Sequence, residues 1–103
     1  SLWKVDDIAT TLLMENFYKH LVEGERIDIS LKLAKTYLKE MNIEEVECNY
    51  LKLLKRYMPD ITDEDVEKVS QWLYSNYSDK PFSHPFYWAG FICMGAGGRI
   101  DFH

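Results

Sequence analysis

His84 and Cys93 are residues of the type that form a cysteine–histidine pair for nucleophilic catalysis. Such a pair needs a thiolate in an electropositive, partly exposed setting, with a base in reach and a third group that orients the base. Cys93 lies within a long apolar run, and His84 directly precedes Pro85, where its ring more readily bonds to the backbone. The sequence therefore argues against a catalytic pair within this chain.

Asp6 and Asp7 are the strongest candidates for a binding site. A carboxylate at this position can cap a helix by accepting the N–H groups of the first turn, where it also suits the helix dipole. It can equally bind a cationic group through a charge-assisted hydrogen bond. From the residues alone, capping is the favoured interpretation, and the ligand role stays open.

Neither a metal site nor a cofactor site is indicated by the remaining candidates. His20 and His103 are isolated, and no Cys-x-x-Cys or His-x-x-x-His spacing occurs in the sequence. The glycines at 95–98 follow the last apolar run and precede no predicted helix, so they do not make a phosphate-binding loop. We expect the chain to use no cofactor.

The chain is organised around the apolar, aromatic-rich run at about 86–94, between Pro85 and the glycine cluster. A run of this length bounded by breakers is typical of a strand, and continuous hydrophobicity indicates that both of its faces are covered. We predict an α/β fold in which this chain has one complete buried strand near 86–94. Because one strand is no sheet, either this chain is part of something larger or its sheet is completed by another chain.

Helical patterns precede this run, and capping residues mark where each helix begins. Asn42 with Glu45 has the spacing of a capping box, and Thr62 with Asp65 repeats it. Lys32, Lys35 and Lys39 lie opposite the apolar face of their helix and are expected to be solvated. Four helices are predicted. The first two run from Asp6 or Asp7 to about Val22 and from Asp28 or Ser30 to about Met41. The third begins at Asn42, has Tyr57 on its inner face and is stopped by Pro59, and the fourth runs from Thr62 to about Tyr77.

Composition and charge exclude several classes of function. The chain has 103 residues and a net charge of −5, which allows one domain or less and argues against direct binding of nucleic acid. No apolar run approaches the ~18 residues of a membrane span. Cys48 and Cys93 are too few and too far apart for a disulfide framework, so we expect reduced thiols and a cytoplasmic location.

Two motifs at opposite ends of the chain carry a resemblance to a known family. Residues 84–91 (HPFYWAGF), followed by Gly95, resemble the closing motif of CHAT domains, which are caspase-like domains found beside TPR repeats. Residues 1–7 (SLWKVDD), with the Phe17-Tyr18 pair downstream, resemble an earlier segment of the same family. The resemblance makes residues 1–103 the C-terminal portion of a CHAT domain, with a helical-hairpin insertion at about 43–77.

The resemblance also implies which residues catalyse the reaction and which bind the substrate. In this family the catalytic His and Cys lie upstream of the Ser-Leu-Trp segment, so no catalytic residue is expected in this chain. The first segment is also similar to separase, in which an Asp at the matching position lies at the bottom of the substrate pocket. This implies that Asp7 selects Arg or Lys before the cut, that Ser1 and Trp3 line the groove, and that Asp6 is the alternative carboxylate.

The function implied is that of the small-subunit-like part of a bacterial, TPR-associated cysteine peptidase. Its expected partners are the upstream part of the same peptidase, a specific protein substrate and an activating protein, with no membrane and no nucleic acid. One alternative is a catalytically inactive interaction module that binds its partner through residues 43–77. An all-helical bundle with no assignable function ranks last, because the two motifs are specific.

Overall fold

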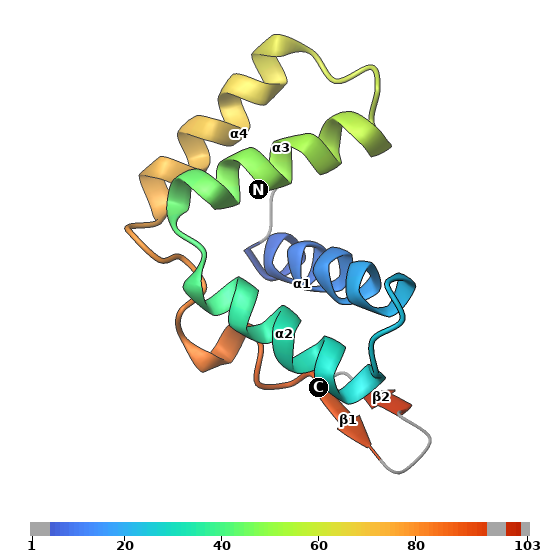
Figure 1. Ribbon diagram of the computed structural model, residues 1–103. Helices are drawn as coiled ribbons and strands as arrows, with labels where there is room; N and C mark the ends of the chain where they lie inside the picture. Colours follow the sequence, from blue (N-terminus) through green and yellow to red (C-terminus); the bar gives the residue numbers. More distant parts are fainter. Residues whose placement is uncertain (1–4, 95–98, 102–103) are drawn as a thin grey trace.

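A computed structural model describes residues 5–94 and 99–101 of the chain (Figure 1). Within these residues there are four α-helices, one 3₁₀ turn and two short strands. Their bounds are α1 Val5–Val22, α2 Ile27–Glu40, α3 Ile43–Tyr57, α4 Asp63–Asn76, η1 Pro85–Tyr87, β1 Ile92–Met94 and β2 Arg99–Asp101.

Helices α1 and α2 lie antiparallel and form the centre of the molecule (Figure 1). Gly24 allows the sharp turn between them, because its φ of +95° is a conformation that side-chain-bearing residues rarely adopt. Apolar residues at helical spacing on both helices meet in the core, as the sequence predicts. The buried members on these two helices are Ile8, Ala9, Leu12, Leu13, Phe17, Leu31, Ala34 and Leu38.

Helices α3 and α4 form a helical hairpin, residues 43–76, that packs on α1 through α3 (Figure 1). The predicted capping box is confirmed, because the Asn42 side chain accepts from the Glu45 N–H and the Glu45 carboxylate accepts from the Asn42 N–H. Thr62 caps α4 by accepting from the Asp65 N–H at 3.1 Å. Tyr57 was expected on the inner face, but it is the last residue of α3 and is 65% exposed.

The chain then returns to the start of the hairpin and runs along α2. The Ile43 N–H donates to the Asp79 carbonyl at 2.8 Å, and Lys80 pairs with Glu40 at 3.1 Å. Phe82 is completely buried. Its ring lies in a chain of aromatic contacts with centroids 5.1–5.9 Å apart, which joins Trp72, Tyr77, Phe82, Tyr87 and Phe86. We call residues 77–91 the aromatic segment.

The predicted α/β fold with a complete buried strand near 86–94 is wrong for this chain. Residues 85–87 form η1, and Phe86 is 70% exposed rather than covered on both faces. Only β1 is extended, and it pairs antiparallel with β2 in a hairpin that aligns Ile92 with Asp101.

The physical reason lies in the backbone hydrogen bonds. A strand needs neighbours for its N–H and C=O groups, and the described part of the chain offers none of matching length. Pro85 lacks an N–H and its fixed φ suits the first position of a helical turn. Its carbonyl accepts hydrogen bonds from the N–H groups of Trp88 and Ala89 at 3.1 and 2.8 Å, so these backbone groups are paired within the segment and need no neighbouring strand.

Candidate functional site

Asp7 lies in the first turn of α1 and its side chain is exposed. Its carbonyl accepts from the Thr11 hydroxyl at 2.6 Å, which is an ordinary contact within the helix. Its carboxylate forms no hydrogen bond or ion pair with any residue that the structure describes. The carboxylate is therefore accessible to a ligand.

Tyr50 of α3 is the residue on which the charge of Asp7 acts. Burial raises the pKa of the Tyr50 phenol, and the negative charge of Asp7 raises this pKa further. Tyr50 is 8% exposed as a residue, so the start of α1 and the middle of α3 together place a carboxylate near a largely buried aromatic residue. An anionic group with an apolar wall behind it suits a long cationic side chain, whose stem is apolar.

The other predicted binding residues cannot be placed in this site. Ser1 and Trp3 lie outside the described residues, and the backbone of Asp6 is in α1 while its side chain is outside the described part. Their assignment to the substrate groove stays a prediction.

His84 has a structural role at the start of η1. Its Nδ1 accepts from the Phe86 N–H at 3.0 Å, which confirms the sequence-based expectation that this ring bonds to the backbone. Cys48 is a free, exposed thiol on α3, and the side chain of Cys93 lies outside the described residues. His84 is thus engaged as a cap rather than as a general base.

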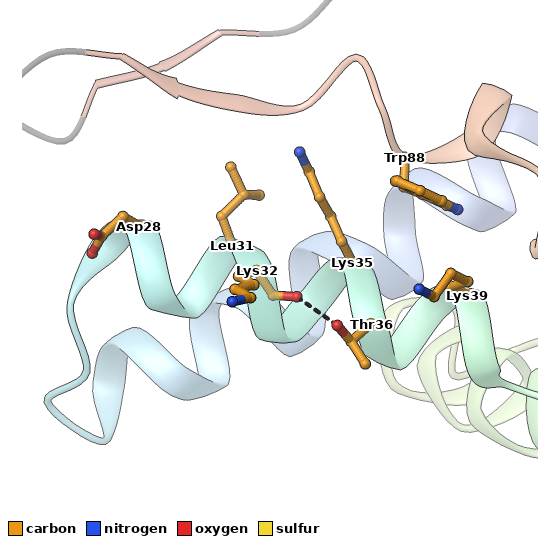
Figure 2. A pocket seen from close by; sticks show the side chains of 7 residues that line it. All are labelled: Asp28, Leu31, Lys32, Lys35, Thr36, Lys39 and Trp88. Atoms are coloured by element: carbon orange, nitrogen blue, oxygen red, sulfur yellow. Dashed lines mark hydrogen bonds between the residues drawn. The ribbon is translucent and has the colours of Figure 1, made fainter.

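A groove with a volume of about 450 Å³ lies between α2 and the end of the aromatic segment (Figure 2). Leu31 and Lys35 rise from α2 on the side of the groove, and Trp88 lies above the Lys39 end of the helix. Lys39 approaches Trp88 with its Nζ 5.8 Å from the ring centroid, within the range of a cation–π contact. We call this the basic groove; its lining residues are Asp28, Leu31, Lys32, Lys35, Thr36, Lys39 and Trp88.

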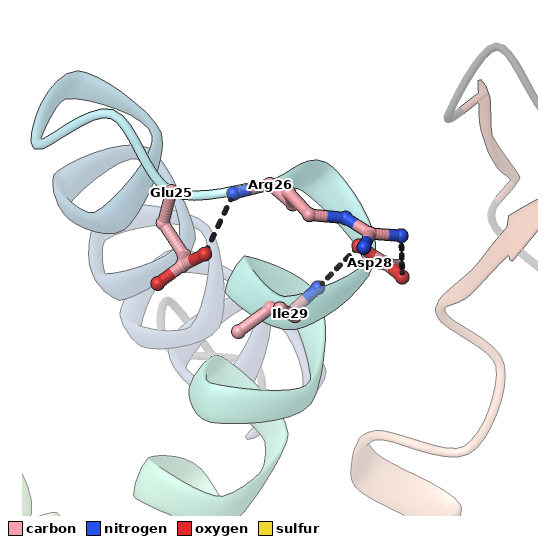
Figure 3. Close-up of polar contacts among 4 residues, drawn as sticks. All are labelled: Glu25, Arg26, Asp28 and Ile29. Atoms are coloured by element: carbon pink, nitrogen blue, oxygen red, sulfur yellow. Dashed lines mark hydrogen bonds and ion pairs between the residues drawn. The ribbon is translucent and has the colours of Figure 1, made fainter.

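Asp28 is the single acidic residue among those that line the basic groove, and its carboxylate already has partners outside the groove (Figure 3). Asp28 pairs through Oδ2 with the Arg26 guanidinium at 2.9 Å and accepts from the Ile29 N–H through Oδ1 at 2.9 Å. No side chain that the structure describes forms an ion pair with Lys32, Lys35 or Lys39. Partial burial lowers the pKa of Lys35, because desolvation disfavours its charged form.

The basic groove was not predicted from the sequence, because Lys32, Lys35 and Lys39 were expected on a solvated helix face. The lysines repeat at helical spacing, as they would on any exposed helix. What distinguishes them is Trp88, which a turn some fifty residues downstream brings over α2. The Pro85 turn signal could have suggested that the aromatic run bends, but nothing local indicated which helix it would meet.

The described residues contain no group of three or more His, Cys, Asp or Glu residues arranged to hold a metal ion. None of their helices is long and apolar enough to cross a membrane.

Comparison with known proteins adds one match. The family model described as the CHAT domain matches residues 1–96, which is nearly the whole chain and includes both end motifs. No curated protein and no solved structure matched.

Proposed function

Because the chain belongs to the CHAT domain family, a caspase-like family, we propose that it is the C-terminal, small-subunit-like part of a cysteine peptidase. The match extends across residues 1–96 and so includes the segment that begins α1. The peptidase would be bacterial and cytoplasmic, associated with TPR repeats, and directed at one specific protein.

The catalytic step would use residues outside this chain. A cysteine thiolate, activated by a histidine, attacks the peptide carbonyl, and the histidine then protonates the leaving amine. Both residues are expected upstream, in the same polypeptide or in a separate chain. This chain would contribute substrate recognition, and an activating protein would control access to the site.

The observation that carries the proposal is the accessible carboxylate of Asp7 beside Tyr50. Asp7 would bind the Arg or Lys side chain that precedes the cut, and the ring of Tyr50 would lie behind it. A charge-assisted hydrogen bond of this kind contributes about 1.5–3 kcal/mol when water is excluded. Trp3 and Ser1, with Asp6 as a second carboxylate, would complete the same wall.

The test is cleavage of a peptide library by the full-length protein and its Asp7→Asn variant. We expect cleavage after Arg or Lys, with kcat/KM lowered by roughly 10- to 100-fold in the variant. Asp63→Asn is the matched control, because Asp63 is also an exposed aspartate in the first turn of a helix. Equal losses in both variants, or cleavage after apolar residues, would contradict the role of Asp7.

One observation favours the alternative, a catalytically inactive interaction module. Tyr57 and Met58 at the tip of the helical hairpin are 65% and 49% exposed, although apolar residues are usually placed inward on an amphipathic helix. Adjacent exposed apolar residues are typical of contact sites. If the full-length protein cuts nothing even with candidate activators, and Tyr57→Ser abolishes binding of a partner, this function replaces the peptidase.

A further inference from the structure

Helix α1 carries apolar residues on two opposite faces. The inner face forms the core through Ile8, Leu12 and Leu13, which are at most 1% exposed. On the opposite face, five residues follow one another at intervals of three or four, which is the spacing of a single helix face. We call them the outer stripe: Asp7, Thr11, Met14, Tyr18 and Val22. After Asp7 the outer stripe has no charged residue, although the outward face of a helix normally carries charged residues.

The far end of the outer stripe is open to solvent. Tyr18 and Val22 are 56% and 87% exposed. The ring centroid of Tyr18 lies 5.6 Å from that of the buried Phe17, so the exposed ring packs against the helix rather than extending into water. Beside them is a hollow of about 330 Å³, lined by Glu15, Tyr18, Lys19, Val22 and Glu23. An apolar centre with a charged rim is the composition of a protein–protein contact.

Helix α3 shows how a solvated face of this protein is composed. Its outward positions include Glu44, Lys52 and Lys55, all of them charged and exposed. In α1 the charged residues lie beside the outer stripe instead, and Glu15 is paired with Arg56 of α3 at 2.8 Å. The outer stripe is therefore unlike a solvated face, and exposed apolar surface of this kind marks a contact site.

We propose that the outer stripe packs against an apolar face of the upstream, catalytic part of the same peptidase. The contact rests on the proposed function, in which Asp7 binds the residue before the cut and the thiolate lies upstream. The cut bond is then within one side-chain length of Asp7, so the part that carries the thiolate must lie next to the start of the stripe. From Asp7 to Val22 a helix rises ~22 Å, which gives that part a continuous surface to pack on.

A second copy of this chain fits the outer stripe less well. In an antiparallel pair of stripes, Asp7 of each copy would lie near Val22 of the other, where its carboxylate loses water and gains no cation. Each copy also carries a net charge of −5, which opposes association. The catalytic part can instead cover the stripe from Thr11 to Val22 and leave Asp7 at the open edge. The Thr11 hydroxyl already donates to the Asp7 carbonyl at 2.6 Å, so covering it leaves this donor paired.

Photo-cross-linking of the full-length protein identifies what covers the outer stripe. A p-benzoylphenylalanine replaces Tyr18, and in the matched control it replaces Tyr57, a tyrosine of similar exposure at the tip of the helical hairpin. We expect the probe at Tyr18 to join residues upstream of Ser1 within the same molecule, as read by mass spectrometry. The probe at Tyr57 is expected to give no such product.

Thermal unfolding of the full-length protein supplies a second measurement. Val22 and Tyr57 are the last residues of α1 and α3, where a lysine suits the helix dipole. A lysine is therefore harmless at either position in water, and it is costly only where another surface covers it. We expect Val22→Lys to lower the Tm by about 5 °C and Tyr57→Lys to change it by under ~1 °C.

Three results would overturn the proposal. The first is a cross-link from Tyr18 between two copies, seen as a doubled mass, which would assign the outer stripe to self-association. The second is the absence of cross-links from Tyr18 to upstream residues, and the third is an equal Tm in the two lysine variants. Peptide cleavage is measured separately: upstream cross-links in a protein that cuts nothing would keep the contact and overturn only the peptidase function.

Discussion

The helical hairpin and the aromatic segment are neighbours in sequence but are stabilised in different ways. Each helix of the hairpin has its own N-cap, formed by Asn42 or by Thr62, and internal backbone hydrogen bonds throughout. Besides the Ile43–Asp79 hydrogen bond and the Lys80–Glu40 ion pair, the aromatic segment has the single turn of η1 and a row of ring contacts centred on Phe82. The hairpin is thus specified locally, whereas the segment depends on what it packs against.

The difference teaches where a single substitution will have a large effect. The energy of the hairpin is distributed over many backbone bonds and two caps, each of modest size. The energy of the aromatic segment is concentrated in one fully buried ring. Four substitutions, in order of decreasing effect, test this contrast.

Phe82→Ala is expected to be the most damaging change. Removing a fully buried phenylalanine leaves a cavity and costs about 3–5 kcal/mol of the free energy of unfolding. Urea denaturation followed by circular dichroism measures the loss. Phe86→Ala is the matched control at a ring that is 70% exposed, and it is expected to cost under ~1 kcal/mol. Similar losses in both variants would remove the contrast between the two regions.

Asn42→Ala removes the cap of α3 and is expected to cost about 1 kcal/mol. The first-turn N–H of Glu45 then loses its partner at 2.9 Å. The same denaturation measurement checks this value, and Asn42→Ser, which restores a capping oxygen, should recover most of the stability. A cost as large as that of Phe82→Ala would show that the hairpin is not stabilised in a distributed way.

Alkaline pH tests the contact between the hairpin and α1. Because the pKa of Tyr50 is raised in the folded protein, the fold holds this proton more tightly than the unfolded chain does. The resulting stability is full at neutral pH and is lost as the pH rises above about 10, the usual pKa of tyrosine. Asp7→Asn should lower the pKa of Tyr50, and burial should keep it above its usual value.

Phenolate absorbance, taken as the difference between each protein and its Tyr50→Phe derivative, follows this titration. Asp63→Asn, on the far side of the hairpin, should leave the Tyr50 titration unchanged. An unchanged titration in Asp7→Asn would mean that the start of α1 does not face Tyr50.

Lys39→Gln is expected to have the smallest effect on folding. It removes the cation–π contact with Trp88, which contributes about 0.5–1 kcal/mol at an exposed site. Thermal unfolding of this variant against Lys55→Gln measures the difference. A loss above that of Asn42→Ala would mean that Lys39 anchors the aromatic segment rather than serving as a free charge in the basic groove.

The helices could be predicted from the sequence because their signals are local. Asn42 with Glu45 and Thr62 with Asp65 each act on residues within one turn, and the structure confirms both caps. The predicted ends, at about Val22 and at Pro59, lie close to the observed ends of α1 at Val22 and of α3 at Tyr57.

The conformation of the aromatic run could not be predicted in the same way. Its hydrophobicity indicates that its residues prefer to be buried, but it does not indicate which backbone conformation buries them. Phe86 and Phe82 are both phenylalanines near Pro85, yet one is exposed and the other is in the core. Of the candidate site, Asp7 was singled out through the family resemblance and its binding role stays a prediction, while the basic groove required knowing that Trp88 lies over α2.

The hydrogen bond from Ile43 to Asp79 has a consequence for how this protein can vary. The helical hairpin begins at one partner of this hydrogen bond and ends just before the other, so the two ends of the hairpin are held together. We call this pair of residues the neck. Material beyond such a neck can lengthen, shorten or change sequence while the course of the chain on either side is preserved. The neck therefore separates a part of the molecule that is free to diversify from the α1–α2 pair, which is not.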